Sequence, residues 1–575
     1  MREAILSSKV FILALDGATF DLIRPWAAAG KLPLFARLMQ TSAWGEIEST
    51  TPPITPVAWL TFATGKNPGK HGVYNFFDPV RRDYTAITPI STTTNTEMTL
   101  WDLLSERGRN VCILNVPMTF PPHAVNGCLY AGMPMPMGDV QYSYPADLHA
   151  ELLAQGWDLS RNAGFSQGTY AEFFDYLKEL VTHRTSATLY LMQNRPWDLF
   201  MIHHLETDQI AHMYWRFWEN EAPDHPLHHA MLHLYQHVEA QIERILDELP
   251  ADASLVIVSD HGMGPVHYHL HLNNWLLQEG FLRWRSTLST HLRRLTYRLG
   301  FNPTNIYRRI PEAVIKRLTL GQTRAEFAQI QREVRTTAGQ KSLVKQWFSK
   351  LIQLPFLYLA DLDWEHSQAY SGDTTQAGLI YINLQGREPH GTVAPGEAYQ
   401  QLREQIRARL YAWINPVTGN KMVQRVCFRE ELYHGHQVEN APDIIAFYHE
   451  PDYESRKGAI FLSTNPVEPI KNAYATHRLM GMTMISGPAI QPGPIQTKLT
   501  LTDMAPLILY LLDEEIPKEF DGRLPEELLK PEQLARRPPK WNNASTTLIQ
   551  GNEAQLSASD QAKILDQLRN LGYVA

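Results

Sequence analysis

Cysteine is scarce in this chain, and the few that occur are not spaced as metal ligands. There are three among 575 residues, Cys112, Cys128 and Cys427, and no two of them form a Cys-x-x-Cys pair. The sequence therefore argues against a disulfide framework and against a thiolate zinc site, and it favours a reducing compartment.

Long apolar runs are missing as well. The run Val10–Leu15 near the start is far too short to span a membrane, and it has no signal-peptide cleavage pattern. No other stretch reaches the length of a membrane span without containing a charge. We expect a cytoplasmic protein on these grounds.

A surplus of positive charge is also absent. The chain has 52 Lys and Arg against 60 Asp and Glu, and the formal net charge of -8 argues against a dedicated nucleic-acid binder. The composition, with 44% hydrophobic and 19% charged residues, is that of an ordinary globular protein with a large core. The sequence leaves the oligomeric state open.

Short apolar runs alternate with longer helical patterns, which is typical of an α/β protein with a mainly parallel sheet. The clearest predicted strands are Val10–Leu15, Val111–Asn115, Leu199–His203, Leu255–Ser259, Ile444–Tyr448 and Met482–Ile485. Helices are predicted at Glu97–Glu106, Ala171–Gln193, His228–Glu248, Tyr399–Trp413 and Asp503–Leu512. We predict a discontinuous core formed by residues 8–270 and 360–530.

The segment between the two parts of this core has a different composition. Within residues 281–350, fifteen Lys or Arg stand against three Glu, a local charge near +12, and aromatic and aliphatic residues are interleaved with them. We predict that residues 271–359 form a basic helical insertion outside the main sheet. Residues 531–575 are expected to form a linker and a short final helix at Ser559–Leu571.

Acidic and histidine residues follow two of the predicted strands. Asp16 ends the run FILALDG, and Asp260 and His261 follow the strand in LVIVSDHGMG. Proteins with a parallel sheet build their sites at its carboxyl edge, so these side chains are candidate ligands of one ion. Gly262 would let the backbone turn close to that ion. Taken alone, Asp16 is more typical of a turn.

A second candidate set lies in IHHLETDQIAHMYW and in THRLMGMTMISGP. Asp208 and His212 have a spacing that puts both on one helical face, and carboxylate and imidazole ligands suit zinc or manganese. His477 precedes a predicted strand and is expected to reach the same cluster. A lone histidine or an Asp–His pair is often structural, so this set depends on the other. Alternative ligands on the strand or turn before the helix are His203, His204 and Glu206.

Thr55 stands before a proline and a helical run in TPPITPVAWLTFATG. We predict that Thr55 is the N-cap and Pro56 the first helical residue, so that the hydroxyl faces free N–H groups that favour a phosphate. A threonine nucleophile needs activation, which metal coordination can supply. The position is equally typical of a plain helix cap. Asn75, in HGVYNFF, is a candidate amide donor to a phosphoryl oxygen, or a turn residue.

In this order, the residues resemble the alkaline phosphatase superfamily, and within it the type I phosphodiesterase and nucleotide pyrophosphatase branch. The similarity includes the opening Asp-Gly, the Thr-initiated helix, the Asp-x-x-x-His, the Ser-Asp-His-Gly, the late His and the closing LTDMAPLILYLLDEEIPKEFDGR. It covers roughly Val10–Gly264 and Trp364–Leu524. It implies an alkaline-phosphatase-like three-layer αβα core with a mainly parallel central sheet and a helical insertion.

The resemblance also implies a two-metal hydrolase of phosphate esters, with phosphodiester or pyrophosphate bonds favoured. Thr55 would form a covalent phospho-threonine intermediate. Zinc is the expected metal and manganese the alternative, and the substrate would be a phosphorylated small molecule, a nucleotide or a lipid-linked phosphate. One ion is expected on Asp16, Thr55, Asp260 and His261, and the other on Asp208, His212 and His477.

Two departures from the branch bear on specificity. Pro56, Val57 and Ala58 stand where nucleotide pyrophosphatases carry Phe-Pro-Asn, and their active-site asparagine aligns with Phe76 rather than Asn75. A phosphomonoesterase or a phosphomutase using the same site is one alternative. A non-catalytic metal-binding scaffold is an alternative of another class, although all seven expected ligand positions are filled.

The resemblance does not explain the basic insertion, for which three hypotheses stand. It could form a cap whose field attracts phosphate-rich substrates. Residues 281–350 could instead lie on an anionic membrane surface, which would make the substrate a lipid-linked phosphodiester. The third hypothesis is a solvated helical face whose charges pair with acids elsewhere.

Overall fold

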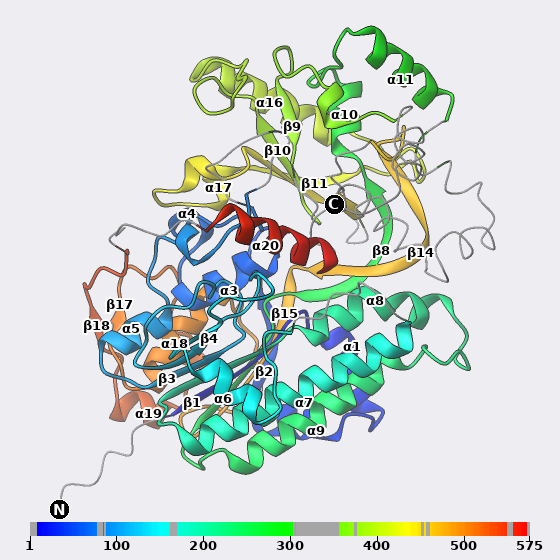
Figure 1. Ribbon diagram of the computed structural model, residues 1–575. Helices are drawn as coiled ribbons and strands as arrows, with labels where there is room; N and C mark the ends of the chain where they lie inside the picture. The colour runs from blue at the N-terminus through cyan, green and yellow to red at the C-terminus, as the bar shows by residue number, and fades with distance from the viewer. Residues whose placement is uncertain are drawn as a thin grey trace, which may run out of the picture.

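The structure is a computed structural model. It describes residues 9–77, 84, 88–161, 169–300, 302, 305, 356–372, 376–449, 453–455, 461–548 and 556–571. Its main sheet has nine strands (Figure 1). In spatial order they are β16 (Gly493–Pro494), β2 (Ala43–Glu48), β15 (Met480–Ser486), β7 (Ser254–Val258), β1 (Val10–Leu15), β6 (Leu199–His204), β3 (Val111–Leu114), β4 (Gly127–Tyr130) and β5 (Ser143–Tyr144).

Most neighbours in this sheet are parallel. Strands β7, β1, β6, β3 and β4 run in one direction. Strand β15 lies antiparallel between β2 and β7, and β5 is antiparallel to β4. The predicted, mainly parallel sheet is therefore confirmed.

The central strand β1 sends its side chains alternately into two hydrophobic cores. Phe11, Leu13 and Leu15 belong to one core, and Val10, Ile12 and Ala14 to the other. The first core is covered by α1 (Phe20–Ala28), α2 (Pro33–Thr41), α6 (Leu148–Ala154), α7 (Tyr170–Asn194), α8 (Glu206–Asn220) and α9 (Ala230–Glu248). The second is covered by α3 (Thr55–Thr64), α5 (Leu100–Glu106) and α18 (Met504–Leu511). Both faces of the sheet are thus buried, which gives the expected three layers.

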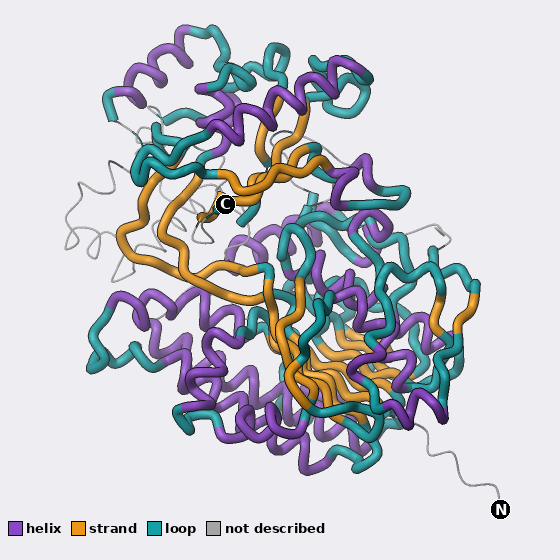
Figure 2. The backbone as a smooth tube through the Cα atoms, turned by 180° about the vertical axis from the view of Figure 1, so that it is seen from behind, coloured by secondary structure: helices purple, strands orange, loops and turns teal. Residues whose placement is uncertain are grey.

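A smaller unit with its own core stands beside the main sheet. Its antiparallel sheet has the order β11 (Val423–Phe428), β12 (Ile444–Tyr448), β10 (Gly378–Ile382) and β9 (Ala369–Ser371). The long strands β8 (Gly262–Leu270) and β14 (Val467–Arg478) join it to the main sheet, as Figure 2 shows from behind. The predicted strand at 444–448 is present, but in this antiparallel sheet, because an apolar run does not reveal its pairing partners.

The predicted helices are present, with small shifts at their ends. α7, α9, α18 and α16 (Glu397–Ala412) differ from their predicted bounds by no more than two residues. The helix predicted from Glu97 begins instead at Leu100, because Thr99 and Asp102 form a capping box. Glu97 is left outside the helix, where it is buried.

The basic insertion is described only in its first part. α10 (Leu272–Gln278) and α11 (Leu288–Arg298) are helical and lie outside the main sheet. Residues 306–355 lie outside the described residues, so the extent of the insertion and the domain boundaries remain predictions. Over the residues the structure does describe, none of the helices combines the length and the apolar character that a membrane crossing requires.

The C-terminal region carries more structure than the linker that the sequence suggests. It contains α19 (Pro531–Arg536), and β18 (Trp541–Asn542) pairs with β17 (Ile516–Pro517). The last helix, α20 (Ala558–Leu571), begins one residue before its predicted start.

A buried ion pair ties this region to the segment after α3. Lys66 and Glu97 are each 1% exposed, and Lys66 Nζ lies 2.5 Å from Glu97 Oε2 and 2.7 Å from Glu519 Oε1. Glu519 also accepts hydrogen bonds from the backbone N–H and the hydroxyl of Thr546. Three segments distant in sequence are thereby joined by one ammonium group.

Replacing Lys66 by Met should lower the free energy of unfolding by about 3–5 kcal/mol, because Glu97 would be left buried without its partner. The matched control is Arg37→Met. It removes an ion pair with Glu243 in which both side chains are more than half exposed (57% and 54%), and it should cost less than about 1 kcal/mol. Urea denaturation measures both values, and equal losses would contradict the assigned role of Lys66.

Candidate metal centre

Three neighbouring parallel strands deliver the candidate ligands to one edge of the main sheet. β1 lies between β7 and β6 and is parallel to both. Asp16 follows β1, Asp260 and His261 follow β7, and Asp208 lies in the first turn of α8, after β6. Because β15 is antiparallel to β7, His477, which stands just before β15, comes to the same edge.

The first predicted set is brought together around His261. Its Nε2 lies 3.5 Å from Asp16 Oδ1 and 3.3 Å from Asp260 Oδ2. Thr55 Oγ1 lies 3.4 Å from the same nitrogen. All four side chains are fully buried. The ligand atoms of Asp16, Asp260 and His261 lie within 4.8 Å of one another, so one cation could touch all three.

The second predicted set is equally compact. Asp208 Oδ1 lies 3.1 Å from His212 Nε2 and 3.5 Å from His477 Nε2, and the two Nε2 atoms are 3.1 Å apart. The His477 ring stacks on His261 with centroids 3.7 Å apart. The two ligand sets are therefore in direct contact through these two rings.

The hydrogen bonds of the three histidines fix which ring nitrogen faces the cluster. In each ring, Nδ1 is hydrogen-bonded to a backbone carbonyl, and a carbonyl oxygen can only accept. Nδ1 therefore carries the proton in the neutral ring, and the lone pair of Nε2 points at the carboxylates. Metal-binding histidines are commonly held in this way. The three pairs are His212 with Ala475 O at 2.8 Å, His261 with Gly262 O at 3.1 Å and His477 with Pro53 O at 2.8 Å.

The carboxylates at this edge repel one another. Burial, together with the charges of the neighbouring carboxylates, raises the pKa of Asp16 and of Asp260 well above the usual range. Burial also opposes ionisation of Asp208, but His212 and His477 outweigh it and lower its pKa. Among the described residues, Asp16 Oδ1 and Asp260 Oδ2 have no hydrogen-bond partner.

A divalent cation would satisfy those oxygens and offset the repulsion. Burial lowers the pKa of His261 to about 4, so this ring is neutral at physiological pH, as a metal ligand must be. Oxygen and imidazole donors without thiolates suit zinc or manganese. The residues at both positions therefore fit the expected metal ions.

Thr55 is one residue further into its helix than the sequence predicts. Ile54 is extended and its carbonyl accepts the first helical hydrogen bond from Ala58 N–H at 2.9 Å, so Ile54 is the N-cap. Thr55 is the first helical residue and Pro56 the second. The hydroxyl of Thr55 is therefore not used as a cap and is turned toward His261 instead.

Asn75 is buried, and its Oδ1 accepts a hydrogen bond from Phe76 N–H at 2.7 Å. That contact is the local turn chemistry that the sequence left as an alternative. A role for the Asn75 amide toward a phosphoryl oxygen stays a prediction.

Sequence reasoning did not find the residues that orient Asp16. The Asp16 Oδ2 atom accepts a hydrogen bond from Trp59 Nε1 at 3.1 Å and lies 2.8 Å from His203 Nε2. Trp59 stands four residues after Thr55, so helical spacing places both on one face of α3. His203, considered above as an alternative ligand, lies against the oxygen that faces away from His261.

The other two alternative ligands, His204 and Glu206, form a buried polar group with a residue of α7. Arg184, a buried residue of that helix, donates to Glu206 Oε1, and His204 Nδ1 lies 3.4 Å from Glu206 Oε2. Glu206 is the first residue of α8 rather than part of the preceding turn. This buried group anchors the start of the helix that carries Asp208.

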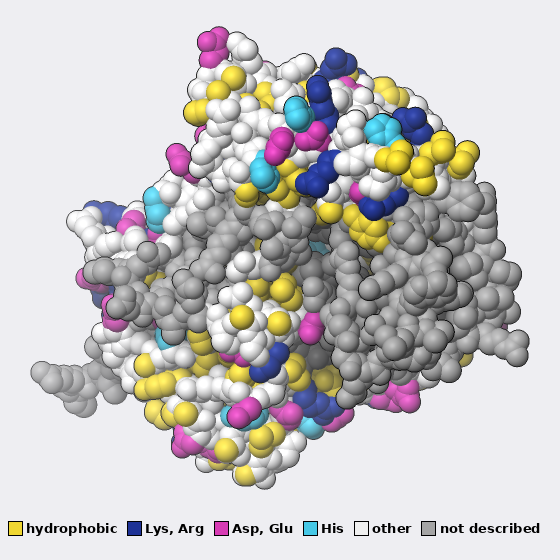
Figure 3. All heavy atoms as spheres, turned by 45° about the horizontal axis from the view of Figure 1, so that its top comes forward, with side chains coloured by type: hydrophobic (Ala, Val, Ile, Leu, Met, Phe, Trp, Pro, Cys, Tyr) yellow, Lys and Arg dark blue, Asp and Glu magenta, His cyan; other side chains and the backbone are white. Residues whose placement is uncertain are grey.

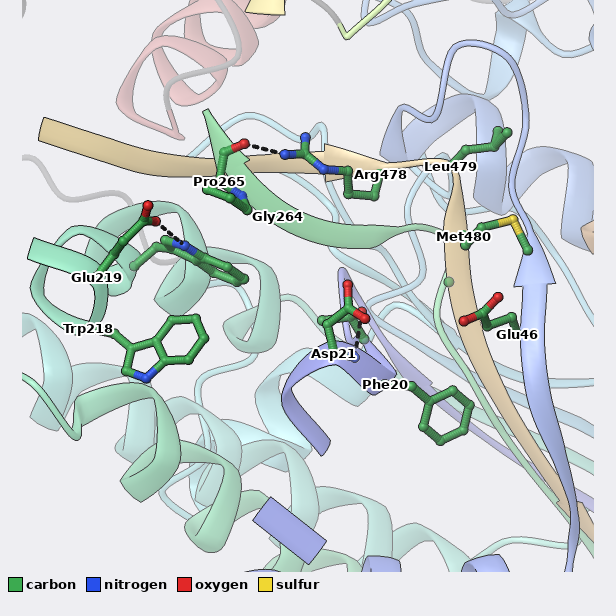
Figure 4. Close-up of a pocket in the computed structure, with 13 residues that line it drawn as sticks. Phe20, Asp21, Glu46, Trp218, Glu219, Gly264, Pro265, Arg478, Leu479 and Met480 are labelled. Carbon is green, nitrogen blue, oxygen red and sulfur yellow. Dashed lines mark hydrogen bonds between the residues drawn. The ribbon is translucent and has the colours of Figure 1, made fainter. Parts of the chain in front are cut away.

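A separate cavity of about 940 Å³ is lined by residues of α1, α8, β8 and the end of β14 (Figure 4). Arg478 lines it and donates to Pro265 O. Side chains alternate along a strand, so Arg478 and His477 face opposite sides of β14. None of the candidate ligands lines this cavity, which therefore lies outside the proposed metal positions.

A family model described as type I phosphodiesterase / nucleotide pyrophosphatase matches residues 10–460. The chain belongs to this family. The resemblance noted from its motifs is thereby confirmed, and the chain is a phosphoester hydrolase of the phosphodiesterase and pyrophosphatase type. No curated protein sequence matches the chain.

Similar solved structures include the human ectonucleotide pyrophosphatase / phosphodiesterase 5. It is 12% identical, with a TM-score of 0.48, over 91% of this chain and 100% of the other. Phosphonoacetate hydrolase from Sinorhizobium meliloti in complex with phosphonoacetate is also 12% identical, with a TM-score of 0.49, over 88% of this chain and 95% of the other. The family assignment rests on the family model alone.

Replacing Trp59 by Phe should weaken binding of zinc about 10- to 100-fold, because Asp16 loses the N–H donor that orients it. The matched control is Trp101→Phe, since Trp101 is also buried but its indole N–H has no hydrogen-bond partner among the described residues. Isothermal titration of the metal-stripped proteins measures the affinity. Equal zinc affinity in the two variants would contradict the role of Trp59.

Proposed function

We propose that the protein hydrolyses phosphodiester or pyrophosphate bonds, with Thr55 as the nucleophile and two divalent cations in the adjoining ligand sets. The observation that supports this most directly is the set of three histidine Nε2 atoms. They converge with buried carboxylates beside the hydroxyl of Thr55. A structural metal is fully enclosed by protein ligands. A hydroxyl next to the ligands, as here, favours instead a metal site that activates a nucleophilic oxygen.

When bound, the cations would lower the pKa of the Thr55 hydroxyl and neutralise charge on the phosphoryl oxygens. Asp16, Asp260 and His261 would hold one of them. Asp208, His212 and His477 would hold the other.

The reaction proceeds in two displacements at phosphorus. In the first, the bond from Thr55 Oγ1 to phosphorus forms while the bond to the leaving oxygen breaks. The hydroxyl proton is released, and the electron pair goes to the leaving group. In the second, a bond from the water oxygen to phosphorus forms while the bond from phosphorus to Thr55 Oγ1 breaks, and Thr55 Oγ1 takes up a proton from the water. Two in-line steps give overall retention of configuration.

The helix that carries Thr55 stabilises the negative charge that develops during the reaction. Thr55 lies in the first turn of α3, where backbone N–H groups without helical partners and the positive end of the helix favour an anion. Trp59, one turn further on, holds Asp16 in position. One helix thus places the nucleophile and orients a candidate metal ligand.

Nucleotide specificity receives no support from the residues after the nucleophile. Pro56, Val57 and Ala58 are all buried, and the latter two pack into the two hydrophobic cores. They offer no side chain to a nucleotide base. We therefore propose a phosphate ester as substrate without assigning a base to it.

Thr55→Ala should lower the hydrolysis of a bis-aryl phosphate diester by at least about a thousandfold, because it removes the hydroxyl that would form the covalent intermediate. The wild-type protein should prefer this diester to the aryl monoester. Thr61→Ala is the matched control. It removes a buried hydroxyl of the same helix that bonds to His71, and it should stay within a few-fold of wild type. Wild-type turnover by Thr55→Ala would refute the mechanism, and a preference for the monoester would favour the phosphomonoesterase alternative.

Removing bound metal should abolish the diesterase activity, since Thr55 then lacks its activation. Dialysis against a chelator followed by addition of zinc or manganese tests this. Activity should return as the second equivalent of metal is added, and circular dichroism provides the control for folding. Full activity in protein shown by elemental analysis to be metal-free would contradict the proposal.

A further inference from the structure

The helix α11 points its leucines away from the protein. Leu288, Leu292, Leu295 and Leu299 recur at helical spacing and are 83%, 62%, 58% and 65% exposed. Helical geometry places all four on one narrow stripe. A surface helix of a globular protein normally buries such a stripe against the core, so this orientation is reversed.

The opposite face of α11 is fastened to the body of the smaller unit. Thr290 and Tyr297 are buried there. Thr290 Oγ1 lies 3.1 Å from Asp361 Oδ1, Arg293 forms an ion pair with Asp361 at 2.6 Å, and the Tyr297 hydroxyl donates to Ser463 O. These contacts hold the helix against rotation, so the leucine stripe remains at the surface.

Basic side chains lie along one side of the leucine stripe and in the segment just before α11. Residues 281–300 contain no Asp or Glu. Arg294 and Arg298 flank the leucines on the helix, and Arg283 and Arg285 are exposed just before it. In Figure 3, hydrophobic and basic side chains lie together at the upper right, where α11 stands in Figure 1, with acidic side chains and histidines elsewhere on the same face.

We propose that the leucine stripe of α11 docks the protein on an anionic lipid surface. Leucines that enter the interface together with arginines that meet anionic headgroups are the features of a helix that lies on a membrane. α11 lies at the end of the smaller unit away from the main sheet (Figure 1). The contact does not depend on the proposed chemistry at Thr55.

A second copy of the chain and residues 306–355 of the same chain are two other candidates for covering the leucine stripe, and both complement its basic side chains less well. A second copy of the chain would bring the same arginines against each other. Residues 306–355 of this chain, with ten Lys or Arg and three Glu, would also place like charge beside the stripe. An anionic bilayer is the occupant that complements both the apolar and the basic side chains.

The test is co-sedimentation of the full chain with vesicles. Wild type should bind vesicles of phosphatidylcholine mixed with phosphatidylglycerol, bind pure phosphatidylcholine weakly, and release at high salt. Leu292→Glu combined with Leu295→Glu should reduce binding at least about tenfold. Arg294→Gln and Arg298→Gln should each reduce it about fivefold.

The matched control is Met137→Glu combined with Leu153→Glu, which adds the same charge at two leucine-like sites that are 46% and 43% exposed elsewhere. It should bind vesicles nearly as well as wild type. Equal loss in the control pair, or absence of binding by wild type to anionic vesicles at low salt, would overturn the proposal. So would self-association that depends on Leu292 and Leu295 without any vesicle binding.

Discussion

The mutual repulsion of three buried carboxylates is the constraint on which the rest of this site depends. Asp16, Asp208 and Asp260 are fully buried at one edge of the sheet. Each would destabilise the fold unless hydrogen bonds or positive charge offset it. His212 and His477 lower the pKa of Asp208, whereas Asp16 and Asp260 each keep an oxygen without a hydrogen-bond partner in the described part of the chain. These side chains thus fit the binding of cations. The hydroxyl of Thr55 next to them is the group that the proposed reaction would use.

The fold achieves this by bringing distant segments to one edge. The parallel pairing of β7, β1 and β6 aligns the ends of three strands, and the antiparallel β15 adds His477 from the far end of the chain. The same strands continue outward, since β8 begins right after His261 and β14 ends right after His477. These two strands carry the smaller unit, so the candidate metal ligands lie where the two parts of the molecule are connected.

Local sequence was sufficient for the features that depend on local structure. An apolar run followed by Asp16, or by Asp260 and His261, indicates a strand and the residues at its end, and the bounds of α7, α9 and α16 were predicted to within two residues. The partners of a strand are set by tertiary packing, so β12 was recognised as a strand but not as part of an antiparallel sheet. The contacts of Trp59 and His203 with Asp16 join residues far apart in sequence, and no local pattern marks them.

The central claim is that one edge of the sheet holds two cations next to Thr55. Anomalous diffraction from crystals grown with zinc tests it most directly. Two peaks are predicted, one in contact with Asp16, Asp260 and His261 and the other with Asp208, His212 and His477. A zinc-loaded crystal with no peak at these residues, or with its peaks elsewhere in the chain, would contradict the account.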